Sequence, residues 1–318
     1  MNEKKKIGSV EEFLKAIFSM MGRISIDNDP TNVFWFRGES HDFNKTSLVP
    51  SAYRILVDAI NDDCDVLLIN RGLDIIKDNE LNITADFHRE ALPYIISRKI
   101  ENTAWNRYFL MQHYKIQTRL LDWTENALLA LFFAIIEDKK QEDNKDDAKV
   151  WILQPFNLNN HTIRTIVSLD MDFKVIPAIS DTNIKQEIFD ESGKMRLDEL
   201  TRRYLKMDFN QKSMNAPLQY YPLAIFPSFL DQRMAAQKSC FTIFGNITSG
   251  LQSLDCSDIL DYVIIDGIYK KSILNELRLI GIDFSSIYPD LDGLGMSIAK
   301  KYEQEYKKTG AFKIKTMH

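Results

Sequence analysis

The chain has 318 residues, of which 45% are hydrophobic and 27% charged, a composition typical of globular proteins. Lys and Arg total 40 against 45 Asp and Glu, and the formal net charge of −5 argues against a broad nucleic-acid-binding surface. The three cysteines and five histidines show no metal-binding spacing, so we expect no metal. The N-terminal segment lacks a signal-peptide pattern, and the apolar run 127–136 is shorter than the roughly 20 residues that span a bilayer. We therefore expect a cytoplasmic protein without membrane contacts.

The first half of the chain is predicted to be mainly helical. Ser9 and Glu12 form the pattern of a capping box at a helix start. The aromatic segment 32–38, which ends at Gly38, is typical of a strand. Apolar spacing and apolar runs predict helices over residues 8–24, from Pro50 onward, over 84–108 and over 127–136.

Strands are predicted to cluster in the second half. The charged run 139–149 is typical of a solvated loop. Short apolar runs bounded by Pro, Gly, Asp or Ser predict strands over residues 150–156, 223–227, 240–245 and 261–268. Helices are predicted over residues 197–209, 269–281 and 289–308, the last capped by Asp290 or Asp292. Helices followed by strands, without regular βαβ alternation, favour an α+β fold with a helical N-terminal half packed on a mixed or antiparallel sheet.

Three segments together resemble the FRG-domain family. They are "FWFRGES" with the Phe-Arg-Gly signature at residues 36–38, "MQHYKIQTRLLDWTENALLALFFA" at 111–134, and a tail pair at 233–245 and 287–295. The tail departs from the family where the Gln–Gly–x–Phe step is Gln237-Lys238-Ser239-Cys240-Phe241. The resemblance covers nearly the whole chain. It implies one FRG-type domain over 1–318, divided into helix-rich 1–138, charged loop 139–149, strand-rich 150–280 and C-terminal helix 289–308. It also implies a bacterial or phage accessory protein, in some cases with a role in phage defence.

The signature strand is also similar to the aromatic–Arg–Gly strand of the arginine-class ADP-ribosyltransferases. That similarity implies an ADP-ribosyltransferase-like fold with NAD as cofactor. Arg37 would hold the NAD phosphates or ribose through its planar guanidinium, and Gly38 would allow a ligand or backbone to approach closely. In that family a Glu or Gln on a later strand acts near the acceptor, which makes Gln237 the candidate here.

Further candidates lie directly before the apolar run. The same similarity implies that Thr124 supplies a hydroxyl near the nicotinamide and that Asp122 bonds the ribose. Trp123 is expected to stack on a flat ring. Arg119 is a further candidate for cofactor binding, and His113 is a candidate general base near neutral pH.

Each candidate also has a structural interpretation, and the sequence leaves both open. Arg37 can pair with Asp122 or Glu39 and hold the first strand against the buried helix. Asp122 or Thr124 can cap that helix, and Arg119 can pair with Asp122. Core packing or a hydrogen bond to neighbouring backbone is the corresponding interpretation for Trp123, Gln237 and His113.

Two functions from different classes follow. The first is an ADP-ribosyltransferase-like enzyme that uses NAD on a macromolecular acceptor. The second is a non-catalytic module that senses a nucleotide or phage component and regulates a partner protein. A nuclease is disfavoured because the sequence shows no paired carboxylates, metal ligands or basic surface. Both favoured functions need one pocket, so we expect Arg37, Asp122, Thr124 and Gln237 around a single cleft.

Overall fold

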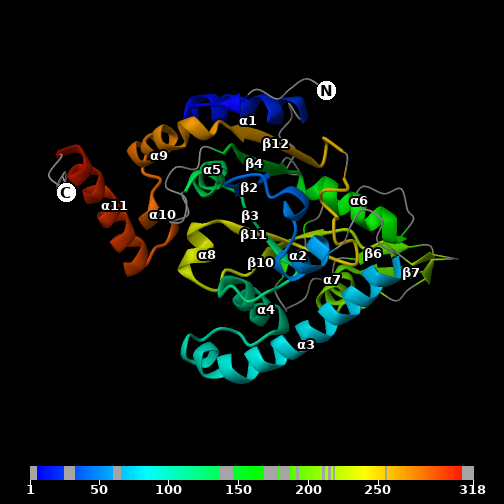
Figure 1. Ribbon diagram of the computed structural model, residues 1–318. Coiled ribbons are helices and arrows are strands. Elements are labelled where there is room, and N and C mark those ends of the chain that lie inside the picture. Colours follow the sequence, from blue (N-terminus) through cyan, green and yellow to red (C-terminus); the bar gives the residue numbers. More distant parts are fainter. Residues whose placement is uncertain are drawn as a thin grey trace.

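The computed structural model describes residues 6–24, 33–59, 66–136, 146–167, 176, 178–179, 187–190, 193–209, 212–213, 216–217, 219–254 and 256–309. Its helices are α1 Val10–Ile24, α2 Ser51–Ala59, α3 Val66–Ser97, α4 Ala104–His113, α5 Ala127–Ile135, α6 Pro155–Val167, α7 Leu197–Lys206, α8 Gln232–Ala236, α9 Lys270–Leu279, α10 Phe284–Ile287 and α11 Leu291–Thr309. Helices cover both faces of a central sheet (Figure 1).

The described strands form one mixed sheet of eight and two small hairpins. In spatial order the sheet contains β1 Lys6–Ile7, β12 Leu260–Ile265, β4 Ala148–Leu153, β2 Trp35–Glu39, β3 Leu120–Thr124, β11 Ser239–Ile243, β10 Leu223–Pro227 and β5 Ala178–Ile179. The outermost pairs, β1 with β12 and β5 with β10, are parallel, and the pairs between them are antiparallel. The hairpins are β6 Glu187–Asp190 with β7 Gly193–Arg196, and β8 Lys212–Ser213 with β9 Ala216–Pro217. The predicted α+β class with a mixed sheet is confirmed.

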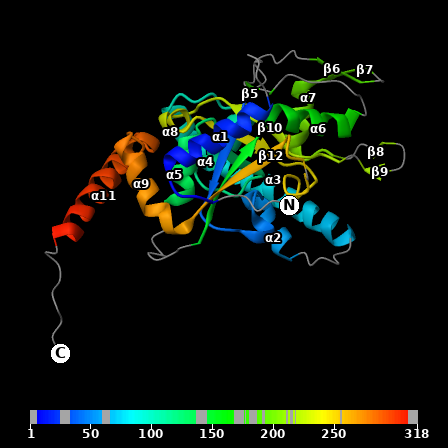
Figure 2. The same ribbon diagram turned by 90° about the horizontal axis from the view of Figure 1, so that it is seen from above.

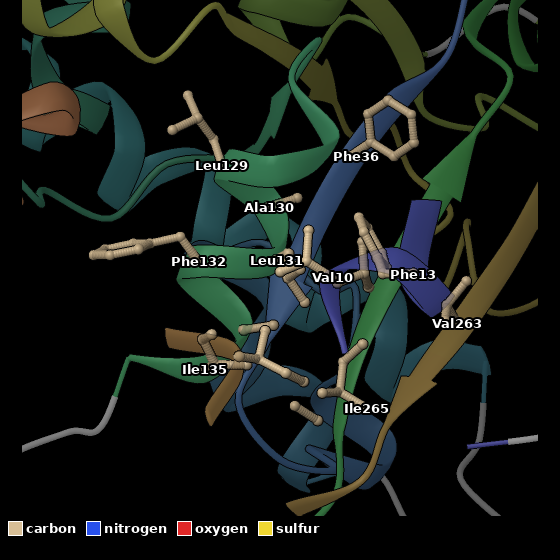
Figure 3. Close-up of a cluster of buried hydrophobic side chains, with 14 of the residues drawn as sticks. Val10, Phe13, Phe36, Leu129, Ala130, Leu131, Phe132, Ile135, Val263 and Ile265 are labelled. Carbon is tan, nitrogen blue, oxygen red and sulfur yellow. The ribbon is translucent and has the colours of Figure 1, made fainter. Parts of the chain in front are cut away.

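Helices α1, α5 and α9 bury one half of one sheet face. Their apolar side chains pack on alternate residues of β2, β4 and β12 because successive side chains of a strand point to opposite faces. Figure 3 shows 14 side chains of this cluster, among them Phe13 of α1, Leu131 of α5 and Val263 of β12. Leu131 and Phe132 are fully buried, so the prediction of a buried helix directly after the polar segment is confirmed.

The other half of the same face belongs to a second cluster. Here α4, α7 and α8 pack on β3, β10 and β11, with Phe109 stacked on Phe241 at 5.3 Å between ring centroids. A third cluster, which contains Trp35 and Trp123, lies on the opposite face under α2 and α6. The two clusters on the shared face meet above β2, β3 and β11.

Both views place α9 and α11 at one end of the molecule and the β6–β7 hairpin at the other (Figures 1 and 2). The short strand β1 pairs with β12, so the first described residues are held beside a strand from the last quarter of the chain.

Several predicted boundaries are wrong. The helix predicted over 84–108 is two helices, because α3 ends at Ser97 and α4 starts after Thr103, whose side chain accepts a hydrogen bond from the Asn106 backbone. Helix α6 begins at Pro155, inside the segment predicted as strand 150–156, and Pro is favoured in the first turn of a helix. Of the predicted charged loop, residues 139–145 lie outside the described residues, and Ala148 and Lys149 already belong to β4.

Candidate functional site

A cavity of about 410 Å³ lies where the two clusters on the shared sheet face meet. The strand register brings Phe36, Thr124 and Ser239 side by side across β2, β3 and β11, and Asp122 beside Phe241. All of these residues line the cavity, which we call the junction pocket. The strands also contribute Arg37, Gly38 and Trp123. The walls of the pocket come from α5, from the end of α4 and from α8 with the turns that follow α4 and α8. These walls contribute Ala130, Phe133, Gln112, His113, Lys115, Arg233, Met234 and Gln237.

Arg37 lies at a point where the sheet opens. Strand β2 pairs with β4 over five residues, but its register with β3 is the single pair Phe36 and Thr124. Beyond that pair the Nη1 of Arg37 donates a 2.9 Å hydrogen bond to the Asp122 backbone carbonyl. Its Nε lies 3.6 Å from a carboxylate oxygen of Glu39. The guanidinium therefore bridges two separating strands at the edge of the junction pocket.

Glu39 is the buried carboxylate beside Arg37. It is 4% exposed and accepts hydrogen bonds from the Ser47 hydroxyl, the Leu48 backbone and the Trp151 indole, the last two at 3.1 and 2.8 Å. The structural pairing of Arg37 with Glu39 is thus present, whereas its contact with Asp122 goes to the backbone carbonyl.

Gly38 serves the packing of α5 on β2. A Cβ at this position would lie 2.1 Å from the Ala130 carbonyl oxygen and 2.5 Å from the Ala134 nitrogen. Both are helix backbone atoms, which cannot move aside as a flexible side chain can. The expected close approach at Gly38 is therefore made by backbone of the chain itself, and the space a ligand would need there is filled.

The Asp122 side chain faces the pocket and is exposed. Its carboxylate accepts a 2.7 Å hydrogen bond from the Gln112 amide, and the Gln112 oxygen in turn accepts one from the Thr118 hydroxyl. This chain of bonds orients the carboxylate while leaving it open to the pocket. An oriented, accessible carboxylate is the type of group that accepts hydrogen bonds from ligand hydroxyls.

Thr124 and Gln237 are joined by a hydrogen bond. The Thr124 hydroxyl donates to the Gln237 backbone carbonyl at 2.7 Å and accepts from the Asn126 backbone at 3.0 Å. Its single proton is therefore committed to the protein. Gln237 ends α8, two residues before β11, so the expectation that it lies on a strand is wrong. Its side-chain amide reaches the Ile287 carbonyl at 3.5 Å.

The cap of α5 is neither Asp122 nor Thr124. The Asn126 side chain accepts hydrogen bonds from the backbone of Leu128 and Leu129 at 3.0 and 3.3 Å, so both capping interpretations are wrong. Asn126 has the extended backbone that an N-cap requires, whereas Asp122 and Thr124 are still within β3. The last helix is capped as expected, since Asp290 accepts a bond from the Gly293 backbone.

His113 ends α4 and lies in the wall of the junction pocket. Its Nε2 is 3.2 Å from a carboxylate oxygen of Asp231, whose other oxygen caps α8 by accepting from the Met234 backbone. Burial lowers the pKa of His113 below its ordinary value, and the nearby Asp231 opposes this shift incompletely. A neutral imidazole held by a carboxylate at neutral pH can accept a proton, which is what a general base needs.

The side chains of two candidates are buried and bonded to other residues of the protein. Trp123 is 3% exposed, lies between the pocket-facing Asp122 and Thr124, and donates from its indole to the Thr242 hydroxyl on the opposite sheet face. Its indole N–H is therefore held by a residue of the protein, and its expected stacking on a ligand ring stays a prediction. Arg119 is fully buried away from the pocket, and its Nε bonds Glu80 at 2.9 Å, so the expected pairing with Asp122 is wrong.

Of the pocket residues that the sequence did not single out, three bear on what the pocket can bind. Arg233 of α8, Lys115 after α4 and Phe133 of α5 all line it. Arg233 stands first in the tail segment "RMAAQKSCFTIFG", so the resemblance contained the signal for it. Lys115 and Phe133 carry no comparable signal, since a Lys in a turn and an aromatic residue in an apolar run are common. With Arg37, the pocket lining has three basic side chains against the single carboxylate of Asp122.

Among the described residues, no helix is both long and apolar enough to cross a bilayer. In the same part of the chain, no cluster of three or more His, Cys, Asp or Glu side chains is arranged to hold a metal ion.

Comparison with known proteins identifies part of the chain. Residues 32–144 match the family model of the FRG domain. The matched segment contains β2, β3 and α5 and thus the floor and one wall of the junction pocket. Arg233, Gln237 and Phe241 lie outside the matched segment and complete the pocket from the second half of the chain. No curated protein and no solved structure matches the chain significantly.

Proposed function

We propose that the junction pocket binds a nucleotide-type ligand such as NAD. The observation that carries this proposal is the combination of groups around one cavity. Arg37 offers a guanidinium suited to phosphate, Asp122 offers a carboxylate suited to ribose hydroxyls, and Phe133 and Phe241 offer apolar surface suited to a base. A nucleotide carries all three chemistries, and a volume of about 410 Å³ lies within the range typical of small-molecule sites.

Of the two functions drawn from the sequence, sensing is favoured over group transfer. The Thr124 hydroxyl proton is committed to the Gln237 carbonyl, and the Gln237 side chain is an amide, which is a poor general base. In a bacterial or phage-defence setting, such a module would change its interaction with a partner protein when the pocket is filled.

Thermal unfolding with NAD, ADP-ribose, ATP and cyclic AMP tests the ligand class. A ligand at about 100 times its dissociation constant stabilises the folded state by about 2.7 kcal/mol, which raises the melting temperature measurably. We expect at least one of the four to do so. Arg37→Gln and Asp122→Asn should each weaken that binding by about tenfold. The matched control is Arg89→Gln, because Arg89 is 71% exposed on α3. If none of the four ligands raises the melting temperature, the proposal is wrong.

The transferase alternative has its own test. Incubation with NAD and measurement of released nicotinamide should show no turnover above that of the Arg37→Gln variant. Turnover that is present in the unmodified protein and lost in Gln237→Ala would instead support the ADP-ribosyltransferase-like function.

A further inference from the structure

Arg233 occupies a defined position in the wall of the junction pocket. It belongs to α8, and its guanidinium carbon lies 4.5 Å from the centre of the Tyr288 ring. Tyr288 in turn stacks on Phe284 of α10, with 18° between the ring planes. A guanidinium that lies over an aromatic ring keeps its N–H groups at the edge of the stack, where they can still donate in the guanidinium plane.

Arg37 and Arg233 share an unmet hydrogen-bonding requirement. The Nε of each is buried, and neither has a hydrogen-bond partner in the part of the chain that the structure describes. For Arg37 the nearest carboxylate oxygen, on Glu39, is 3.6 Å away. Buried donors in folded proteins are usually satisfied, so an unsatisfied one calls for an explanation. Both belong to arginines that line one cavity, and an anion bound there would supply acceptors for the guanidinium N–H groups that reach the cavity.

The charges around the pocket favour an anion as that acceptor. Lys115 adds a third basic side chain to the two arginines. Asp122 is the carboxylate of the lining, and Glu39 lies 3.6 Å from the Arg37 Nε. Asp122 comes from the middle strand, β3, whereas Arg37 comes from β2 on one side and Arg233 from α8, which leads into β11 on the other.

We propose that Arg37 and Arg233 form two anion subsites of the junction pocket, which therefore takes a nucleoside diphosphate ester with one phosphate at each arginine. This inference rests on the proposed nucleotide-binding function and narrows its ligand class. A nucleoside monophosphate fills the Arg37 subsite alone. The second phosphate completes the hydrogen bonding of Arg233, so the pocket selects diphosphates over monophosphates of the same base.

The proposal also assigns a role to the tail segment 287–295. Tyr288 supports the Arg233 guanidinium, and the Ile287 carbonyl accepts from the Gln237 amide, so consecutive tail residues hold two residues of the pocket wall. Tyr288 acts through Arg233 and is a positioning residue. Its ring matters for this purpose and its hydroxyl does not.

Isothermal titration of the full chain with ADP, AMP and adenosine tests the two subsites. The unmodified protein should bind ADP at least about tenfold more tightly than AMP, as expected for one added charge-assisted interaction. Arg233→Gln should remove that preference and leave the affinity for AMP within about twofold. Tyr288→Phe should keep the preference because it keeps the ring, and Tyr288→Leu should reduce it. Arg89→Gln again serves as the exposed control.

The possible results distinguish failure of the two-subsite proposal from failure of the proposed nucleotide binding. If the panel of NAD, ADP-ribose, ATP and cyclic AMP shows binding but ADP is not preferred over AMP, the two-subsite proposal is overturned and nucleotide binding stands. An ADP preference that survives Arg233→Gln overturns it as well. Because the ADP to AMP ratio of the unmodified protein is itself a test, the proposal can fail even where a variant does not fold.

Discussion

At the scale of single residues, the Phe-Arg-Gly signature combines a packing role at Gly38 with a position in the pocket lining at Arg37. Gly38 has no side chain, and that absence lets the α5 backbone approach β2. Arg37 extends across the opening between β2 and β3 and reaches the pocket. The signature therefore does two things at once. Gly38 fixes the helix that forms one wall of the pocket, and Arg37 places a guanidinium at the pocket edge beside that wall.

We predict that Gly38→Ala is strongly destabilising. The added Cβ would meet backbone atoms of Ala130 and Ala134 at 2.1 and 2.5 Å, so β2 or α5 must shift, and overpacking of this kind typically costs about 1–3 kcal/mol or more. Gly22→Ala is the matched control. A Cβ there meets nothing within 4 Å, and Ala is the better helix former by about 1 kcal/mol. Urea unfolding of both variants should show opposite signs, and a neutral Gly38→Ala would contradict the close packing.

A second prediction concerns which carboxylate depends on Arg37. Removing Arg37 leaves the buried Glu39 with three hydrogen-bond donors, so Arg37→Ala should cost only about 1–2 kcal/mol. Asp122→Asn should not restore that stability, because the Asp122 carboxylate is exposed and bonds Gln112. Glu39→Gln should alter the loss instead. A double-mutant cycle in chemical unfolding measures both couplings, and rescue by Asp122→Asn would show that the relevant partner is Asp122.

At the scale of elements, α5 shows what the sequence predicts well. Every residue of α5 is apolar, which is more than an exposed helix carries, and the structure packs these side chains between β2, β4 and α9. The break between α3 and α4 was not predicted. Lys99 adopts a left-handed backbone at φ 56° without being Gly or Asn, and the Thr103 cap is recognisable only once the break is known. Local signals located the helices, whereas the turn between them depends on how α3 and α4 pack.

We predict that Leu131→Ala in α5 costs about 2–5 kcal/mol, because Leu131 is fully buried and the truncation leaves a cavity. Leu279→Ala provides the contrast within α9. That side chain is 87% exposed, so its loss should change the free energy of unfolding by less than about 0.5 kcal/mol. Thermal or urea unfolding compares the two, and a loss below about 1 kcal/mol for Leu131→Ala would mean that α5 is peripheral.

At the scale of the whole molecule, distant segments converge at two places with different chemistry. The junction pocket gathers Arg37, Asp122, Thr124 and Gln237, as the sequence predicts, because β2, β3 and the α8–β11 segment that carry them are neighbours in the sheet. The second place was not predicted. Arg119 was assigned to the pocket, since nothing in the sequence connects it to Glu80, which lies 39 residues earlier on α3. Long-range ion pairs leave no local pattern.

The Arg119 network joins four parts of the chain. Its guanidinium bonds Glu80 at 2.9 Å, the Phe244 carbonyl at 2.8 Å and the Leu205 carbonyl at 3.3 Å, and the Tyr108 hydroxyl accepts from the Arg119 backbone. We predict that Glu80→Ala costs about 3–5 kcal/mol because it leaves a buried charge without its ionic partner. Glu90→Ala, at a 74% exposed position of the same helix, should change little. Calorimetry measures the unfolding of both variants. Equal losses of stability for Glu80→Ala and Glu90→Ala would show that the buried ion pair does not hold α3 in place.

The pairing of β1 with β12 and of β4 with β12 has a consequence for folding in the cell. Residues 148–153 of β4 present an unpaired strand edge until residues 260–265 of β12 have been synthesised. Strand β1 also has no pairing partner until then. Contacts this far apart in sequence make folding slow and leave apolar strand edges exposed meanwhile. The nascent chain should therefore depend on chaperones over the last part of its translation. Chains that terminate before residue 260 should accumulate as aggregates, even though they contain the whole segment 32–144 that matches the family model.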